Sequence, residues 1–223
     1  MAKHCRLITL STITDLGLVP LFFHADAAVA IKIVSACADG GALFVEFTNR
    51  GDRAFDVFRE IAAHRDRERP ELILGVGSVC NAGAAALYMS AGADAIVSPI
   101  LDEDIARTCN SQKIPYIPGC GSASEVHQAH LLGVDICKIF PAGDVGGPGF
   151  IKNVKAPCPW ATLMPSGGVS PTKENLTEWF NAGAACVGIG SKLISNERLA
   201  AKDYPGITKK VKETLALIRG IRA

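Results

Sequence analysis

The sequence predicts an α/β protein that folds as one (β/α)8 TIM barrel, and three observations lead to this prediction. Short apolar segments of strand length alternate along the whole chain with longer segments of helical spacing. Such alternation favours parallel pairing, and eight strand-helix units close naturally into a barrel. The alternative is an open doubly wound sheet, but no G-x-G-x-x-G motif follows the first strand segment.

The expected strands are short apolar runs at residues 18–23, 43–48, 72–76, 95–98, 115–117, 136–140, 161–164 and 186–189. Helical spacing fills residues 27–39, 52–65, 82–91, 103–111, 124–132 and 172–182, and each segment ends near a glycine, proline or polar residue. After Ser195, residues 207–221 have the pattern of a basic amphipathic helix that caps the barrel. No linker divides the chain, so residues 1–223 are expected to form a single domain.

Composition limits the class of ligand. Hydrophobic residues make up 48% of the chain, which permits a large core, and the net charge of +1 provides no basic face for nucleic acid. An anionic ligand therefore has to be held by local groups. The eight cysteines contain no C-x-x-C pair, the N-terminus lacks a signal-peptide core, and no apolar run has membrane-spanning length. We expect reduced cysteines and a cytoplasmic protein without membrane contact.

Lys138 interrupts an otherwise apolar strand segment, and lysine is rarely buried unless it is paired or chemically used. Alternation places it on one face with Ile136 and Phe140, and places Glu46 on one face with Phe44. If both faces line the barrel interior, the two charged groups converge. A buried amine is a nucleophile suited to Schiff-base formation with a ketone, and a nearby carboxylate moves protons. A structural Lys–Glu ion pair is the alternative, although desolvation makes it costly.

Two glycine-rich segments follow the last two strands, where barrel enzymes frequently bind phosphate. These segments contain Ser166, Gly167 and Gly168, and Gly190 and Ser191. Glycine lets backbone N–H groups approach an anion closely, and the serine hydroxyls can donate as well. Glycine is also common in ordinary turns, but two such segments at these two strand ends favour a phosphate site.

Other polar positions follow the earlier strands. Arg50 can grip a carboxylate in bidentate fashion, Ser78 can hydrogen-bond the same group, and Pro99 lies just after the fourth strand. Each also has a structural interpretation as a surface or turn residue. No H-E-x-x-H motif or carboxylate cluster is present, so no metal is expected.

The segments VEFTNR, GVGSV, IVSPI, PYIPGC, KIFPAG, PSGGV and GIGSKL occur in this order at the expected strand ends. Together they resemble the 2-keto-3-deoxy-6-phosphogluconate (KDPG) aldolase / 4-hydroxy-2-oxoglutarate (KHG) aldolase family over nearly the whole chain. The resemblance implies a class I aldolase on a (β/α)8 barrel, usually a homotrimer, with no metal or other cofactor.

The resemblance also implies a role for each position. Lys138 would form the Schiff base and Glu46 would be the general acid and base. The remaining positions would contact the substrate: Arg50, Ser78, Pro99 and Phe140 at the pyruvate end, and Ser166, Gly167, Gly168, Gly190 and Ser191 at the phosphate. The sequence departs from the family in the loop after KIFPA, where Gly143 and Asp144 replace a glutamate or similar polar residue. This loop bears on substrate specificity.

The expected reaction is cleavage of KDPG to pyruvate and glyceraldehyde 3-phosphate. Two alternatives keep the Schiff-base chemistry and act on KHG or on 2-keto-3-deoxy-6-phosphogalactonate. A third belongs to another class, a non-catalytic phosphosugar-binding barrel in which Lys138 forms a salt bridge with its ligand.

Overall fold

The structure is a computed structural model that describes residues 2–223. Its strands are β1 (Leu18–Phe22), β2 (Phe44–Thr48), β3 (Ile73–Gly77), β4 (Ala95–Val97), β5 (Tyr116–Ile117), β6 (Gly119–Cys120), β7 (Cys137–Ile139), β8 (Leu163–Pro165) and β9 (Val187–Ile189). They pair in parallel in the orders β5-β4-β3-β2-β1-β9 and β6-β7-β8. Only Pro118 separates β5 from β6, and a parallel bridge between Ser166 and Gly188 joins β8 to β9. The predicted (β/α)8 barrel is confirmed.

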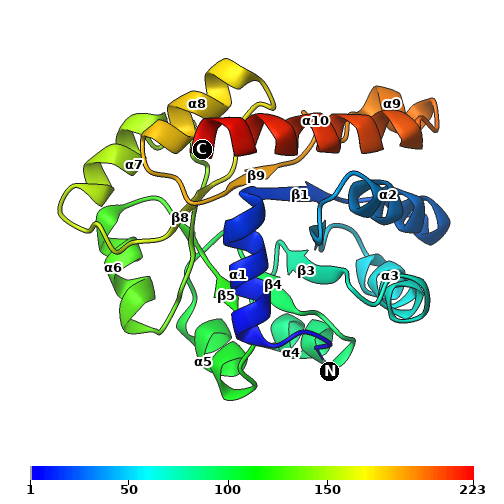
Figure 1. The fold of residues 1–223 in the computed structure, drawn as a ribbon. Helices are drawn as coiled ribbons and strands as arrows, with labels where there is room; N and C mark the ends of the chain where they lie inside the picture. Colours follow the sequence, from blue (N-terminus) through cyan, green and yellow to red (C-terminus); the bar gives the residue numbers. More distant parts are fainter. Residues whose placement is uncertain (1) are drawn as a thin grey trace.

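The helices surround this barrel (Figure 1). They are α1 (Arg6–Leu16), α2 (Ala27–Asp39), α3 (Ala54–Glu68), α4 (Ala82–Ser90), α5 (Glu103–Ser111), α6 (Ala123–Leu131), α7 (Gly147–Lys155), α8 (Lys173–Asn181), α9 (Asn196–Ala200) and α10 (Tyr204–Arg222). In Figure 1, α1 crosses the centre of the ring and α10 packs along its outside. No helix within residues 2–223 is long and apolar enough to span a membrane.

Three helices, α1, α7 and α9, are absent from the sequence-based prediction. The segment of α1 is rich in β-branched residues, which have modest helix propensity, and it buries only Thr9 and Ile13. Residues 143–149 were expected to form a loop, yet α7 begins inside them at Gly147. A proline in the first turn of α7 suits a helix start.

The barrel interior is a separate apolar cluster. It comprises Val19, Phe44, Ile73, Ala95, Val97, Ile117, Ile136, Met164 and Cys186, together with Ile13 of α1. The larger cluster fills the space between the strands and the surrounding helices. Because alternate strand residues share a face, Glu46 follows Phe44 into the interior and Lys138 follows Ile136.

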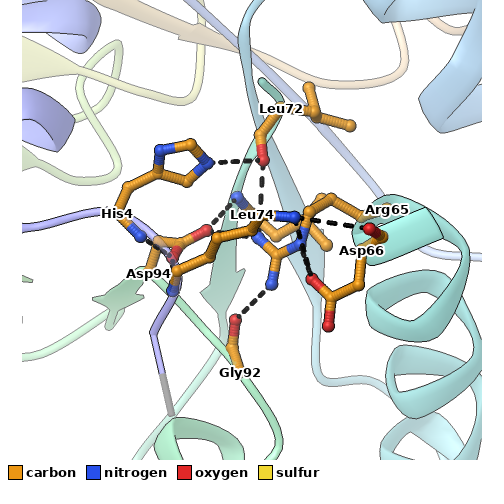
Figure 2. A network of polar contacts seen from close by, with 8 residues as sticks. His4, Arg65, Asp66, Leu72, Leu74, Gly92 and Asp94 are labelled. Atoms are coloured by element: carbon orange, nitrogen blue, oxygen red, sulfur yellow. Dashed lines mark hydrogen bonds and ion pairs between the residues drawn. The ribbon is translucent and has the colours of Figure 1, made fainter. Parts of the chain in front are cut away.

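A buried polar network ties the N-terminal segment to the N-terminal ends of the strands (Figure 2). Asp94, 0% exposed, accepts a hydrogen bond from Arg65 Nη1 at 2.6 Å and from the Leu74 backbone N–H at 2.9 Å. Its other oxygen accepts from the backbone N–H groups of Lys3 at 2.7 Å and His4 at 2.9 Å. These bonds fasten the segment that leads into α1 at the end of the barrel opposite the loops that follow the strands.

Candidate active site

Lys138 and Glu46 are both buried inside the barrel. Lys138 is the central residue of β7 and is 6% exposed, whereas Glu46 lies in β2 and is 1% exposed. Burial raises the pKa of the Glu46 carboxyl above its ordinary value, and the positive charges of Lys138 and Arg50 lower that pKa in part. The electrostatic coupling shows that the amine and the carboxyl act on each other, as the shared interior face predicts.

The two groups do not form the structural ion pair that was the main alternative. Among residues 2–223, neither Lys138 nor Glu46 belongs to any ion pair within 4.0 Å. The Lys138 Nζ atom lies 4.9 Å from the centroid of the Phe140 ring. Glu46 Oε2 is buried without a hydrogen-bond partner in the described chain. A buried amine and a buried carboxyl that are not joined in an ion pair are available for chemistry.

A cavity of about 410 Å³ opens at the C-terminal ends of the strands. The predicted residues that line it are Arg50, Phe140, Ser166, Gly167, Gly168, Gly190 and Ser191. Lys138 and Glu46 are not part of this lining, and Phe140 connects the cavity to the Lys138 amine below it. The structure thus brings the predicted phosphate residues, Arg50 and Phe140 to one cavity above the buried pair.

Two glycine-rich segments of the cavity lining, residues 166–168 and 190–191, are called the glycine corners. The first has a backbone conformation that allows a ligand to approach its N–H groups closely. Gly167 and Gly168 have φ values of 84° and 88°, a left-handed conformation that L side chains rarely adopt. The Gly143 backbone N–H donates to the Gly167 carbonyl oxygen at 2.9 Å. The loop that follows Lys138 therefore packs directly against Gly167 and the predicted phosphate segment.

Ser78 and Pro99 lie at the same end of the barrel but outside this cavity lining. Both are half-buried, Ser78 directly after β3 and Pro99 two residues after β4. A Cβ atom at Gly119 would lie 2.2 Å from the Pro99 carbonyl oxygen, and Gly119 is the strand partner of Lys138. Pro99 thus packs beside the strand neighbour of the lysine, whereas Ser78 makes no hydrogen bond to Lys138 or Glu46 within residues 2–223.

Thr48 and Lys192 are among the cavity-lining residues that the sequence-based reasoning did not single out as site residues. Thr48 donates from its hydroxyl to the Phe22 carbonyl oxygen at 3.1 Å, and its alternation with Glu46 was a signal for its position. Lys192 follows Ser191 directly, and its amine donates to Ser170 Oγ at 2.7 Å. Arg50 and Lys192 are the charged residues of the lining, and both are basic. The cavity is therefore suited to an anionic ligand.

Two further observations concern other possible sites. Residues 2–223 contain no group of three or more His, Cys, Asp or Glu side chains that could hold a metal ion. A second cavity of about 440 Å³ has lining residues from α6 and α7, among them His127 and Phe150, and Trp160 beyond α7. None of the predicted site residues lines it. Although this cavity is slightly larger than the first, none of its lining residues links it to the buried lysine.

Comparison with known proteins gives a consistent result. Residues 10–210 match the aldolase family described as KDPG and KHG aldolase. The 2-dehydro-3-deoxy-phosphogluconate aldolase of Pseudoalteromonas atlantica is 32% identical over 99% of this chain and 100% of its own. The KHG/KDPG aldolase of Escherichia coli K12 is 32% identical over 92% of this chain and 93% of its own.

A solved structure adds to the comparison. The crystal structure of the 2-keto-3-deoxy-6-phosphogluconate aldolase of Zymomonas mobilis ZM4 with 3-phosphoglycerate is 28% identical to this chain. It covers 96% of this chain and 97% of its own, with a TM-score of 0.81. With the family match spanning residues 10–210 and relatives at 32% identity along nearly their whole length, the chain belongs to the KDPG and KHG aldolase family.

Proposed function

We propose that the protein is a class I aldolase, a carbon–carbon lyase that cleaves KDPG to pyruvate and glyceraldehyde 3-phosphate. The observation that carries the proposal is the Lys138 amine, which is buried in the barrel, has no ion-pair partner among residues 2–223, and lowers the pKa of the buried Glu46 carboxyl through its charge. Relatives named KDPG aldolase support the choice of reaction.

In the proposed reaction, the Lys138 amine attacks the C2 ketone of the substrate, and loss of water gives a protonated imine. Glu46 then takes the proton of the C4 hydroxyl. As the C3–C4 bond breaks, its electrons pass to the imine and form an enamine, and the aldehyde phosphate leaves. Protonation of the enamine at C3 and hydrolysis of the imine release pyruvate and restore the amine. Because the imine is the electron sink, this reaction needs no metal or other cofactor.

The raised pKa of Glu46 suits this role. A carboxyl that accepts a proton in one step and returns it in another works best when its pKa approaches the working pH. Burial raises the pKa of Glu46 in this direction. Phe140 packs against the nucleophile, because its ring centroid lies 4.9 Å from Lys138 Nζ.

We assign the substrate's two anionic ends to different parts of the site. Arg50 is proposed to hold the carboxylate at the pyruvate end, together with Ser78 and Pro99. The phosphate is proposed to lie against the two glycine corners, which contribute backbone N–H groups and the hydroxyls of Ser166 and Ser191. The substrate is thus a small phosphorylated keto acid.

One experiment tests this function directly. The protein is incubated with pyruvate and borohydride, which traps an imine as a stable adduct on the lysine, and pyruvate release is assayed over a panel of 2-keto-3-deoxy acids. We expect an adduct on Lys138 and faster turnover of KDPG than of its unphosphorylated analogue. In Lys138→Ala, both the adduct and the turnover should disappear. If the protein binds the phosphorylated acid but forms no adduct, the aldolase proposal fails in favour of a non-catalytic phosphosugar-binding barrel.

The same panel separates the alternatives within the family. The Escherichia coli relative at 32% identity is named KHG/KDPG aldolase, so KHG belongs in the panel beside the galactonate epimer of the substrate. We expect the highest kcat/KM for KDPG. A higher kcat/KM for KHG would show that the two glycine corners do not determine substrate specificity through a phosphate group.

Three wider properties complete the proposal. The family resemblance implies a homotrimer, which sedimentation equilibrium would test. The eight unpaired cysteines favour a cytoplasmic enzyme. We also propose that residues 1–223 are a single domain, which would unfold in one cooperative transition.

A further inference from the structure

We infer that Gly77 is a positioning residue for Glu46: its missing side chain leaves the space in which the Glu46 carboxyl lies. The inference rests on the proposed function, because it explains how that function places its acid and base. Gly77 ends β3, the strand next to β2, and lies opposite Thr48 in the register.

The contact is close. A Cβ atom at position 77 would lie 1.8 Å from Glu46 Oε1, 2.6 Å from its Cδ and 3.0 Å from its Cγ. Contacts below 3.0 Å essentially do not occur for a real Cβ atom. The register partner of Glu46 on β3 is Gly75. The Glu46 side chain therefore extends along the interior by two residues and lies against the backbone of Gly77.

The glycine is explained by this contact and not by its backbone. Gly77 is not among the glycines with positive φ, so alanine could adopt the same conformation. The three atoms nearest to the missing Cβ all belong to the Glu46 side chain. An added methyl group would thus press first on the carboxyl end of a flexible side chain, so we expect the side chain to move while the barrel remains.

Displacing this carboxyl matters because little else fixes it. Glu46 Oε2 is buried and has no hydrogen-bond partner in residues 2–223. Its position therefore depends on packing, and Gly77 is one wall of that packing. A displacement of about 1 Å can reduce turnover by about 100-fold when proton transfer depends on alignment.

The same strand offers a matched control. Gly75 lies on the same face of β3, and a Cβ atom there would lie 2.5 Å from Cζ of Phe44. Phe44 belongs to the interior cluster and is 0% exposed. Gly75→Ala should therefore disturb the core one layer below the site and lower the melting temperature, with kcat at 25 °C close to that of the wild type.

The test uses Gly77→Ala, Glu46→Asp and the double variant in the full chain, with Gly75→Ala as control. For Gly77→Ala we expect kcat for KDPG to fall about 10- to 100-fold, KM to stay similar, and the borohydride adduct with pyruvate to persist on Lys138. Aspartate is one methylene shorter and withdraws from position 77. Adding Gly77→Ala to Glu46→Asp should consequently reduce kcat by less than about threefold, a strong coupling between the two sites.

Two results would overturn the inference: a wild-type kcat in Gly77→Ala, or an equal fold loss whether position 46 carries glutamate or aspartate. A kcat loss in Gly75→Ala as large as that in Gly77→Ala would do so as well. If Gly77→Ala does not fold, the Glu46→Ala/Gly77→Ala protein decides, because removal of the Glu46 side chain should restore folding. Continued failure to fold would contradict the proposed contact.

A failure of the proposed function can be distinguished from a failure of the Gly77 inference. A wild-type protein that neither forms the adduct nor releases pyruvate would refute the aldolase proposal. The contact between Gly77 and Glu46 would still be tested by thermal unfolding, because the melting temperatures of the single and double variants should be non-additive whether or not the protein turns over KDPG.

Discussion

Replacing Glu46 with glutamine should remove activity and stabilise the fold at the same time. Glu46 is 1% exposed, lacks an ion pair within the described chain, and has one carboxylate oxygen without a hydrogen-bond partner. Such a group lowers stability when it is charged, because the charges of Lys138 and Arg50 compensate its desolvation only in part. Glutamine has nearly the same shape and no charge, so its amide group would occupy the same space beside Gly77.

The magnitudes follow from these contacts. Loss of general acid–base catalysis should lower kcat by about 10²- to 10⁴-fold. An unpartnered buried group costs about 1–3 kcal/mol when it is neutral and more when it is charged, and glutamine removes only the added cost of the charge, on the order of 1–3 kcal/mol. In a chain of this size 1 kcal/mol corresponds to about 2–4 °C in melting temperature. We therefore expect Glu46→Gln to melt about 2–12 °C higher than the wild type at pH 8.

The pH dependence gives the sign of the effect. Burial raises the folded-state pKa of Glu46, so between the unfolded and folded pKa values the native state binds more protons than the unfolded state. This contribution to stability is complete below the unfolded pKa and is lost as the pH rises through the folded pKa. The advantage of Glu46→Gln should accordingly shrink as the pH falls toward the ordinary carboxyl pKa of 4.5.

The assays are pyruvate release, borohydride trapping and melting curves from pH 4.5 to pH 8. A Glu46→Gln protein that is less stable than the wild type at pH 8 would refute this reasoning, because it would show that the carboxylate stabilises the fold as an ion-pair partner. Unchanged kcat would separately remove Glu46 from the proton transfer.

Three further predictions concern other parts of the barrel. Arg65→Met leaves Asp94 buried without its cation, which should cost about 3–5 kcal/mol and lower the melting temperature by about 6–20 °C with kcat at 25 °C unchanged; a loss below about 2 °C would contradict the structural role. Lys192→Ala should raise KM for the phosphorylated keto acid about two- to fivefold and leave KM for the unphosphorylated acid unchanged, a modest effect because the amine is exposed; Lys192→Arg should restore KM, and Lys209→Ala serves as a control. Dialysis against a chelator should leave turnover unchanged, and a loss that metal restores would refute the cofactor-free Schiff-base reaction.

Features that depend on local sequence pattern could be predicted. The faces of Lys138 and Glu46 follow from the period of two along each strand, and both interior assignments agree with the neighbouring cluster residues. The barrel could likewise be predicted from the alternation of strand and helix segments, because each strand is recognised by its own apolar run. The expected strand at residues 115–117 corresponds to β5, whereas β6, which follows after Pro118, lies beyond the predicted segment.

Features that depend on distant contacts were not predictable from local pattern. Helix α1 follows a segment held by Asp94, and the bond from the Lys3 N–H to that carboxylate joins residues 91 positions apart. The role of Gly77 depends on the direction in which the Glu46 side chain leans across β2 and β3. A glycine before Ser78 looks like an ordinary turn residue until the neighbouring strand is in place.

Within residues 2–223 the barrel contains two buried acidic groups with opposite surroundings, and the contrast distinguishes a role in stability from a role in catalysis. Asp94 accepts four hydrogen bonds, including one from the Arg65 guanidinium, so its charge is compensated and holds the N-terminal ends of the strands together. Glu46 is as deeply buried, yet it has no ion-pair partner in the described chain and one unpartnered oxygen. If stability alone had shaped both positions, Glu46 would have acquired partners or been replaced by an apolar residue. A carboxyl near the C-terminal ends of the strands that has no ion-pair partner in residues 2–223, beside an amine that has none there either, is therefore best explained by the proton transfer proposed for it.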